Sequence, residues 1–256
     1  ASGFPALKQS QKKHTPGACE AEATPGFTVA FITFAETFFN PEAFELTVLE
    51  QALSEERFST FLGWTAGDRD AAIGLYTSNA LLSESLHIPL HILEVTLRNR
   101  IHAVLMEIAP IDWFEDERFQ RSRNQKKMLE RAKQDVGAWR TTSTALIPAL
   151  TFGYWAAFLG PEYEALWRTS LHKIARTRDG KYMGRKQLSS RLGPVRKLRN
   201  RIAHYEPIIH WDLPQAYADM VQLIEWLSAP AALWCRTHCR FESIWAAQGP
   251  VVTSLI

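Results

Sequence analysis

The chain has 256 residues, of which 46% are hydrophobic and 22% are charged, and its formal net charge is +2. This composition is ordinary for a soluble globular protein with a sizeable core, and it excludes a largely disordered chain. A net charge this small does not by itself indicate a polyanionic partner.

The N-terminal segment, residues 1–40, is rich in Lys, Ser, Thr, Pro, Gly and Ala and lacks sustained periodicity. We expect a flexible arm, or an added segment outside the folded protein, followed by one all-helical domain over residues 41–256. The apolar run Phe27–Ala35 is too short to span a bilayer and follows acidic residues, so no membrane or export signal is expected.

The cysteines Cys19, Cys235 and Cys239 are odd in number and unevenly placed, which predicts free thiols in a reducing, cytoplasmic compartment. Cys235, His238 and Cys239 supply only three of the four ligands that a structural zinc site needs. We therefore expect neither a metal nor another cofactor.

From residue 41 onward, apolar residues recur three and four positions apart, a pattern typical of amphipathic helices. It predicts helices over 44–53 and 73–81, and a long helix over 87–107 with a buried stripe formed by Leu90, Leu93, Leu97, Ile101 and Leu105.

Further along, the pattern predicts a charged helix over 123–139, an apolar segment over 144–159 that ends at Gly160–Pro161, and a helix over 162–176. A basic helix over 185–204 follows, with a break at Gly193–Pro194 left open. Asp212 is placed to cap the last long helix. No alternating strand pattern stands out, so we predict an all-α helical bundle with short connections.

The basic helix concentrates charge: residues 183–205 contain no Asp or Glu but include seven cations, Arg185, Lys186, Arg191, Arg196, Lys197, Arg199 and Arg201. Such a run is as typical of a solvated helix face as of a nucleic-acid surface.

Arg199, Asn200 and His204 place a guanidinium, an amide and an imidazole within six residues of this helix. Asn200 and His204 share one helix face, and the long side chain of Arg199 has to reach back to join them on a phosphate. Arginine stabilises charge on a phosphoryl group and histidine transfers protons near neutral pH. These groups suit RNA cleavage by the neighbouring 2′-hydroxyl. Spacing alone favours helix packing or phosphate binding without reaction.

A resemblance to a known family favours the chemical interpretation. Arg199-Asn200-x-x-x-His204 resembles the Arg-polar-x-x-x-His motif of the HEPN superfamily of helical ribonucleases, and the surrounding sequence is similar to its Abi-like (abortive infection) branch. The similarity spans roughly residues 44–226 and lies in four blocks that occur in the same order, Tyr76–Asn79, Leu90–Asn99, Leu150–Trp155 and Arg199–Ile208.

The resemblance implies a HEPN-type bundle that acts as a homodimer, with Arg199 and His204 of two protomers facing one another across a cleft. It implies a toxin-like or phage-defence endoribonuclease, with an antitoxin or regulatory protein as a further partner, transfer RNA as a first substrate to test, and no metal. The residues expected to hold the RNA backbone are Lys186, Arg196, Lys197 and Arg201.

Supporting residues are expected on the earlier long helix. Glu94 and Arg98 are spaced for an ion pair, and the resemblance favours Glu94, Arg98 and Asn99 as residues that hold the basic helix and orient Arg199. Tyr205 either packs at the helix end or donates to the scissile region. The segment Leu97–His102 is similar to Leu198–His204 but one residue shorter, so we do not count it as a second active motif.

Two other functions stay open on the sequence alone. The chain could be a non-catalytic RNA-binding, nucleotide-binding or protein-interaction module that uses the same basic surface. A weaker alternative is duplex-DNA binding through a helix-turn-helix built on the basic helix.

Overall fold

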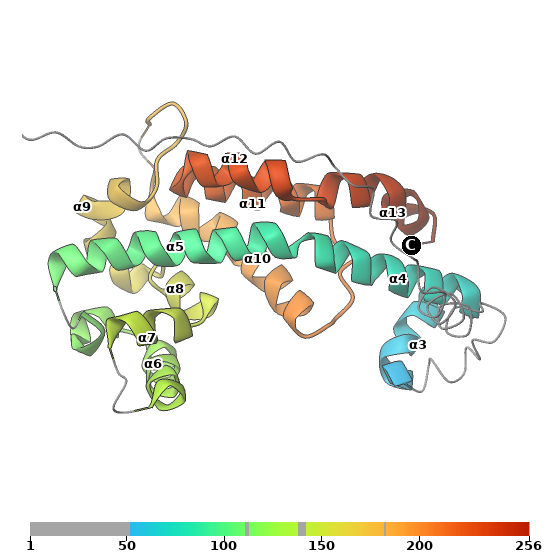
Figure 1. Ribbon diagram of the computed structural model, residues 1–256, viewed down its shortest axis with the longest axis horizontal. Helices are drawn as coiled ribbons and strands as arrows, with labels where there is room; N and C mark the ends of the chain where they lie inside the picture. The colour runs from blue at the N-terminus through green and yellow to red at the C-terminus, as the bar shows by residue number, and fades with distance from the viewer. Residues whose placement is uncertain (1–51, 111–112, 138–141, 182, 256) are drawn as a thin grey trace, which may run out of the picture. The chain divides into compact units, whose positions relative to one another are not determined.

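The computed structural model describes residues 52–110, 113–137, 142–181 and 183–255, and this part of the chain is helical without any strand (Figure 1). The predicted all-α fold is confirmed. The arm predicted over 1–40, the domain start at residue 41 and most of the helix predicted over 44–53 lie outside the described residues. None of the described helices is both long enough and apolar enough to cross a membrane.

The α-helices follow one another with short connections. In chain order they are α3 (Glu55–Trp64), α4 (Arg69–Ser85), α5 (His87–Ile108), α6 (Arg123–Val136), α7 (Ser143–Ala149), α8 (Phe152–Ala157), α9 (Glu164–Ile174), α10 (Arg185–Ala203), α11 (Leu213–Leu227), α12 (Ala229–His238) and α13 (Phe241–Leu255). Single 3-10 turns, η2 (Trp113–Glu115), η3 (Glu117–Phe119) and η5 (Pro161–Tyr163), lie between some of them.

Helix α5 is the central element, because it packs against α8, α9, α11 and α12. Figure 1 shows α11 and α12 along one side of it and α8 on the other. The stripe predicted from the sequence is buried at every position, Leu90, Leu93, Leu97, Ile101 and Leu105. Because other helices cover α5 on two opposite sides, apolar residues recur along all of its six turns.

Side-chain caps start several helices where the sequence supplies a short polar residue. Asp68 accepts a hydrogen bond from the backbone N–H of Ala71 at 3.0 Å, and Asp212 accepts one from Gln215 at 3.1 Å, as predicted for the last long helix. Such caps satisfy N–H groups that have no partner inside the helix.

Four features of the fold differ from the sequence expectation, and the first is helix α3, which the pattern did not predict. The apolar segment 144–159 is divided into α7 and α8, since Leu150 leaves the helical conformation and Thr151 caps the next helix. The break left open at Gly193–Pro194 does not occur: α10 is continuous, and the carbonyl that Pro194 leaves unpaired belongs to exposed Ser190. Two further helices, α12 and α13, follow the last helix that we predicted.

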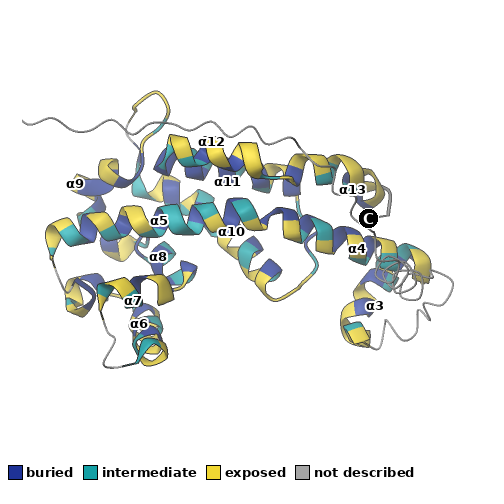
Figure 2. Cartoon of the chain, in the orientation of Figure 1, coloured by how far each residue is buried: buried dark blue, intermediate teal, exposed yellow. Residues whose placement is uncertain are grey.

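An aromatic cluster forms the core on the α8 side of α5, and Figure 2 shows buried residues in α8. Trp113 is fully buried, and its ring lies 5.8–6.5 Å from the rings of Phe114, Phe119, Tyr154, Trp155 and Phe158. Phe152, Tyr154, Trp155 and Phe158 therefore pack in the core. Edge-to-face packing of this kind adds to the stabilisation from buried area.

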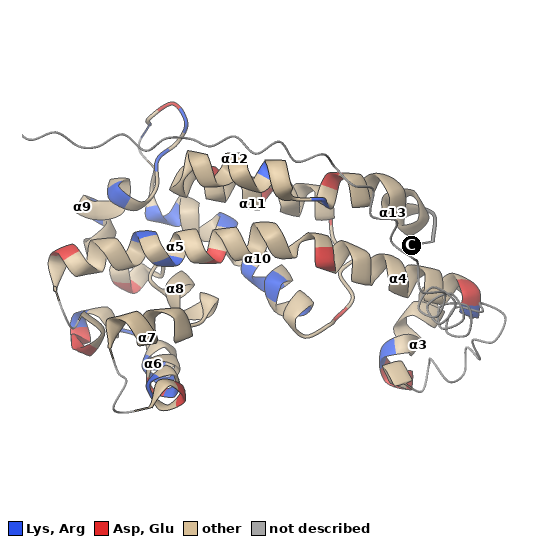
Figure 3. Cartoon of the chain, viewed as in Figure 1, with Lys and Arg blue, Asp and Glu red and all other residues tan. Residues whose placement is uncertain are grey.

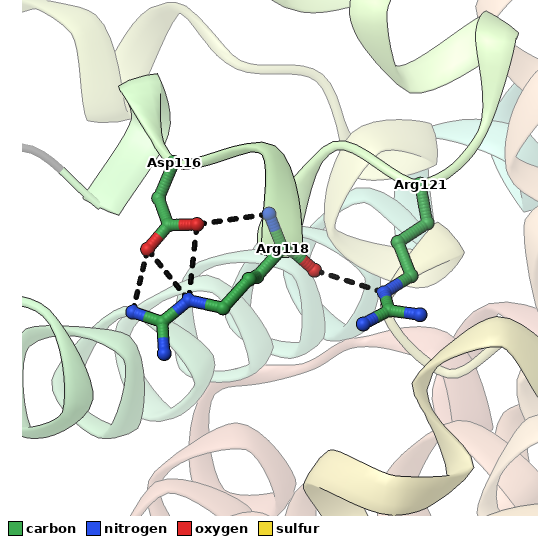
Figure 4. Close-up of polar contacts among 3 residues, drawn as sticks. All are labelled: Asp116, Arg118 and Arg121. Atoms are coloured by element: carbon green, nitrogen blue, oxygen red, sulfur yellow. Dashed lines mark hydrogen bonds and ion pairs between the residues drawn. The ribbon is translucent and has the colours of Figure 1, made fainter.

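The turn between η2 and α6 is held by charged groups that satisfy one another (Figure 4). Asp116 accepts from the backbone N–H of Arg118 at 2.9 Å and from its guanidinium at 2.6–3.1 Å, which lowers the pKa of Asp116. Arg121 in turn donates to the carbonyl of Arg118 at 3.2 Å. These contacts hold the backbone of the turn in place.

We expect opposite effects on stability when Tyr154 and Tyr163 are each replaced by phenylalanine. The hydroxyl of buried Tyr154 has no hydrogen-bond partner among the described residues, whereas Tyr163 donates to Gln125 at 2.7 Å and accepts from the N–H of Arg121 at 3.0 Å. We expect Tyr154→Phe to raise the free energy of unfolding by about 1 kcal/mol and Tyr163→Phe to lower it by about 1–3 kcal/mol. Urea unfolding of both variants measures this, and a loss of stability in Tyr154→Phe contradicts it.

Candidate functional site

Helix α10 has a buried and an exposed face. The buried face consists of Leu188, Leu192, Val195, Leu198 and Ile202. Since each residue turns the helix by about 100°, Lys186, Lys197, Asn200 and His204 lie on the opposite side. All four are exposed. We call this exposed face of α10, formed by Lys186, Lys197, Asn200 and His204, the α10 ridge.

His204 stands at the end of α10, where the chain makes a tight turn. The N–H of Tyr205 donates to Ile202 at 3.1 Å and that of Glu206 donates to Arg201 at 2.9 Å, the Schellman pattern of helix termination. Tyr205 has a φ of 57°, a left-handed conformation that glycine usually occupies. Its side chain is 79% exposed, so the alternative that it packs at the helix end is wrong.

Arg201 has a different task from the RNA contact that we predicted. Its guanidinium donates to the carbonyl of Pro207 and to His210 Nε2, each at 3.1 Å, and lies 3.4 Å from the Glu206 carboxylate. Burial and the Arg201 charge both lower the pKa of His210. Arg201 therefore holds the turn after His204, and about a third of its side chain is exposed.

Asn79 of α4 holds the same turn from the other side. Its buried side-chain oxygen accepts a hydrogen bond from the N–H of Ile208 at 2.7 Å. A buried N–H without a partner costs about 1–3 kcal/mol, so this bond is a strong constraint on the turn. The first and last sequence blocks of the family resemblance meet at this contact.

Arg199 points away from His204. Its Nη2 lies 3.5 Å from Glu94 Oε2 of α5, and the two side chains are 35% and 27% exposed. Glu94 pairs with Arg199 and not with Arg98, the partner that spacing suggested. Arg199 and His204 are about 140° apart on an ideal helix. The expectation that the long side chain of Arg199 reaches back to His204 is thus wrong for a single chain.

Arg98 and Asn99 line a separate small cleft further along α5. Arg98 donates to Asn99 Oδ1 at 3.3 Å, and the cleft, about 220 Å³ in volume, is completed by His102, Ser143 and Thr144. Arg98 thus lies one turn beyond Glu94 and contacts neither Glu94 nor Arg199.

His102 is the one polar residue of this cleft that sequence reasoning set aside. Trp113 Nε1 donates to His102 Nδ1 at 3.0 Å, so the neutral ring carries its proton on Nε2. Burial, and then the charge of Arg98, lower the pKa of His102 below its ordinary value of 6.5. The similarity of Leu97–His102 to Leu198–His204 was the available signal, which the one-residue difference in spacing led us to discount.

The other cations of α10 divide into two groups. Arg185 pairs with Glu164 of α9, and Arg191 pairs with Asp219 of α11 at 3.0 Å, so both join helices. Three cations are exposed and make no ion pair within the described part of the chain, Lys186, Arg196 and Lys197. Figure 3 shows positive charge along α10.

Cys235 and Cys239 carry free thiols, as expected, and Cys19 lies outside the described residues. His238 stacks on Trp234 at 4.3 Å and bonds its carbonyl. Over residues 52–255, apart from the gaps named above, no group of His, Cys, Asp and Glu side chains is arranged to hold a metal ion.

No protein-family model matches the sequence, and no curated protein or solved structure matches it either. A function for this chain has therefore to be inferred from its motifs and from the geometry above.

The left-handed residue after His204 predicts a stabilising substitution. Tyr205→Gly removes the steric cost of a side chain at positive φ, and we expect the free energy of unfolding to rise by about 0.5–1 kcal/mol. Ala203→Gly, two residues earlier and inside the helix, is the matched control and lowers stability by about 0.5–1 kcal/mol. Thermal or denaturant unfolding measures both, and destabilisation by Tyr205→Gly contradicts the turn described here.

The lowered pKa of His102 predicts a stability that depends on pH. The folded state disfavours protonated His102, so its contribution is fully present above pH 6.5 and is lost as pH falls through the lowered pKa. We expect His102→Gln, which keeps an acceptor for Trp113, to show a flatter fall in Tm between about pH 7.5 and about pH 5. His210→Gln removes the parallel contribution of His210. The assignment is contradicted if the Tm of His102→Gln and the Tm of the parent protein change with pH in the same way.

Proposed function

We propose that this protein is a metal-independent endoribonuclease of the HEPN type whose active site is shared between two copies of the chain. The exposed His204–Asn200 face at the end of α10 is the observation that carries the proposal. An acid/base group that meets RNA has to be accessible, and free cations, Lys186 and Lys197, share its face. The motif similarity supplies the reaction type.

The separation of Arg199 from His204 supports a composite site. In one chain Arg199 faces α5, while His204 faces solvent. A second copy could present its His204 to Arg199 with Arg199 still paired to Glu94, because a third of the Arg199 side chain is exposed. Two-fold symmetry then creates two equivalent sites, and contact between the ridges supplies the enclosure that a single ridge lacks.

In this mechanism the 2′-hydroxyl attacks the adjacent phosphorus atom and the 5′-oxygen leaves. His204 transfers protons, Arg199 stabilises the negative charge on the crowded phosphate, and Asn200 orients it. Glu94 keeps the Arg199 guanidinium in place. Lys186, Arg196 and Lys197 hold the flanking backbone. The products carry a 2′,3′-cyclic phosphate and a 5′-hydroxyl.

The biological role that fits this chemistry is a cytoplasmic toxin or phage-defence effector, restrained by an antitoxin or another regulatory protein. Transfer RNA is the first substrate to test.

We expect the purified protein to cleave total RNA in the presence of EDTA and His204→Ala to be slower by about 100-fold or more. His87→Ala, which removes an exposed histidine at the start of α5, is the matched control and keeps the parent rate. Sequencing of the new RNA ends identifies the products. Loss of cleavage in EDTA, or full activity in His204→Ala, overturns the proposal. RNA binding without any cleavage by the parent favours the non-catalytic binding module instead.

The same assay tests whether the site is shared. Arg199→Ala and His204→Ala are each inactive alone, but a randomly mixed dimer joins an intact Arg199 to an intact His204 at one of its two sites. Half of the dimers are mixed, so subunit exchange restores about a quarter of the parent activity. No recovery after verified exchange shows that each chain uses its own pair.

A further inference from the structure

A second cationic site lies on a different side of α5. A cleft of about 450 Å³ is formed where the end of α9 and the chain after it meet the junction of α11 and α12. Its lining includes five basic residues, Arg100, His172, Lys173, Arg176 and Arg178, and one acidic residue, Glu225. Clefts of roughly 300–1,000 Å³ are those that hold small ligands.

The walls of this cleft are fixed by hydrogen bonds to main-chain carbonyls. Arg100 Nε donates to Leu227 at 2.9 Å, and the backbone N–H of Arg176 donates to Trp226 at 2.8 Å. Arg176 Nε also donates to His172 at 2.9 Å. Each guanidinium is therefore positioned through Nε, and both terminal nitrogens of each remain for a ligand.

The positive charge of the cleft comes from side chains. The C-terminus of α11 and the N-terminus of α12 meet there, so their opposite dipoles largely offset one another. Glu225 is paired with Arg236 at 3.0 Å, and Lys173 is paired with Glu107. Arg178 makes no ion pair within the described part of the chain. The positive charges of Arg178, Arg100 and Arg176 are therefore not neutralised by acidic residues of the cleft.

We propose that this cleft binds a small polyphosphate ligand, of the size and charge of a nucleoside triphosphate. Hydrogen bonds to the last carbonyls of α11 give Arg100 Nε and the backbone N–H of Arg176 a structural role. Arg178 has no such role. Several cations around a compact cleft fit a ligand that carries several negative charges close together. This site is distinct from the α10 ridge, and its ligand does not depend on the ribonuclease proposal.

The test is calorimetric titration of the full chain with ATP, with inorganic tripolyphosphate and with adenosine at fixed ionic strength. We expect ATP and tripolyphosphate to bind and Arg178→Glu to weaken both by about tenfold or more. Equal affinities show that the phosphate chain is the recognised group, and tighter binding of ATP shows that the nucleoside adds contacts.

Lys181→Glu is the matched control. Lys181 lies on the same loop, its side chain is 81% exposed, and it does not line the cleft. Because the change in net charge is the same, a general electrostatic attraction weakens binding equally in both variants, and that result overturns the proposal. So does the absence of any binding of ATP and tripolyphosphate by the parent protein, or binding of adenosine alone.

Discussion

The pitch of a single straight helix constrains the candidate site. Arg199 lies in α10 and His204 is the C-cap of that helix, so a separation of five residues places them on different sides of it. The buried stripe of α10 then decides which of them faces the protein and which faces solvent. Arg199 lies at the edge of that stripe and meets Glu94, while His204 is exposed. A site that uses both residues consequently requires a second surface.

Helix α5 distributes polar groups to separate sites around its circumference. Glu94 faces α10, and Arg98, about 40° further round the helix, faces the small His102 cleft. Arg100 lies about 120° from Glu94 and reaches the cleft at the α11–α12 junction. The apolar stripe between these directions is fully buried. Because the buried residues of α5 hold this helix against the core, the Cα position of each of these polar residues is fixed.

Sequence periodicity predicted the fold well where burial is one-sided or sustained. The stripe of α5 and the cap at Asp212 are local properties, so both could be predicted from spacing. The division at Thr151 could not, because the apolar run continues through it. The partner of Glu94 also required the fold, since Arg98 and Arg199 are equally suitable by charge and only packing places Arg199 within reach. The role of Asn79 depends on a contact across 129 positions of sequence.

The division of the cations on α10 shows why a count of charges is a poor guide to nucleic-acid binding. Arg185, Arg191 and Arg201 are bound to acceptors of their own chain, and an RNA phosphate would have to share these guanidinium groups with those acceptors or displace them. Lys186, Arg196 and Lys197 are exposed, so a phosphate could bind them without competing with an acceptor of the same chain. When exposed cations bind a nucleic acid, the counterions around its phosphates are released. The electrostatic part of RNA affinity should therefore follow the three exposed cations. Lys186 and Lys197 lie on the face of His204, so an anionic partner drawn to them would contact the side of α10 on which this histidine is exposed.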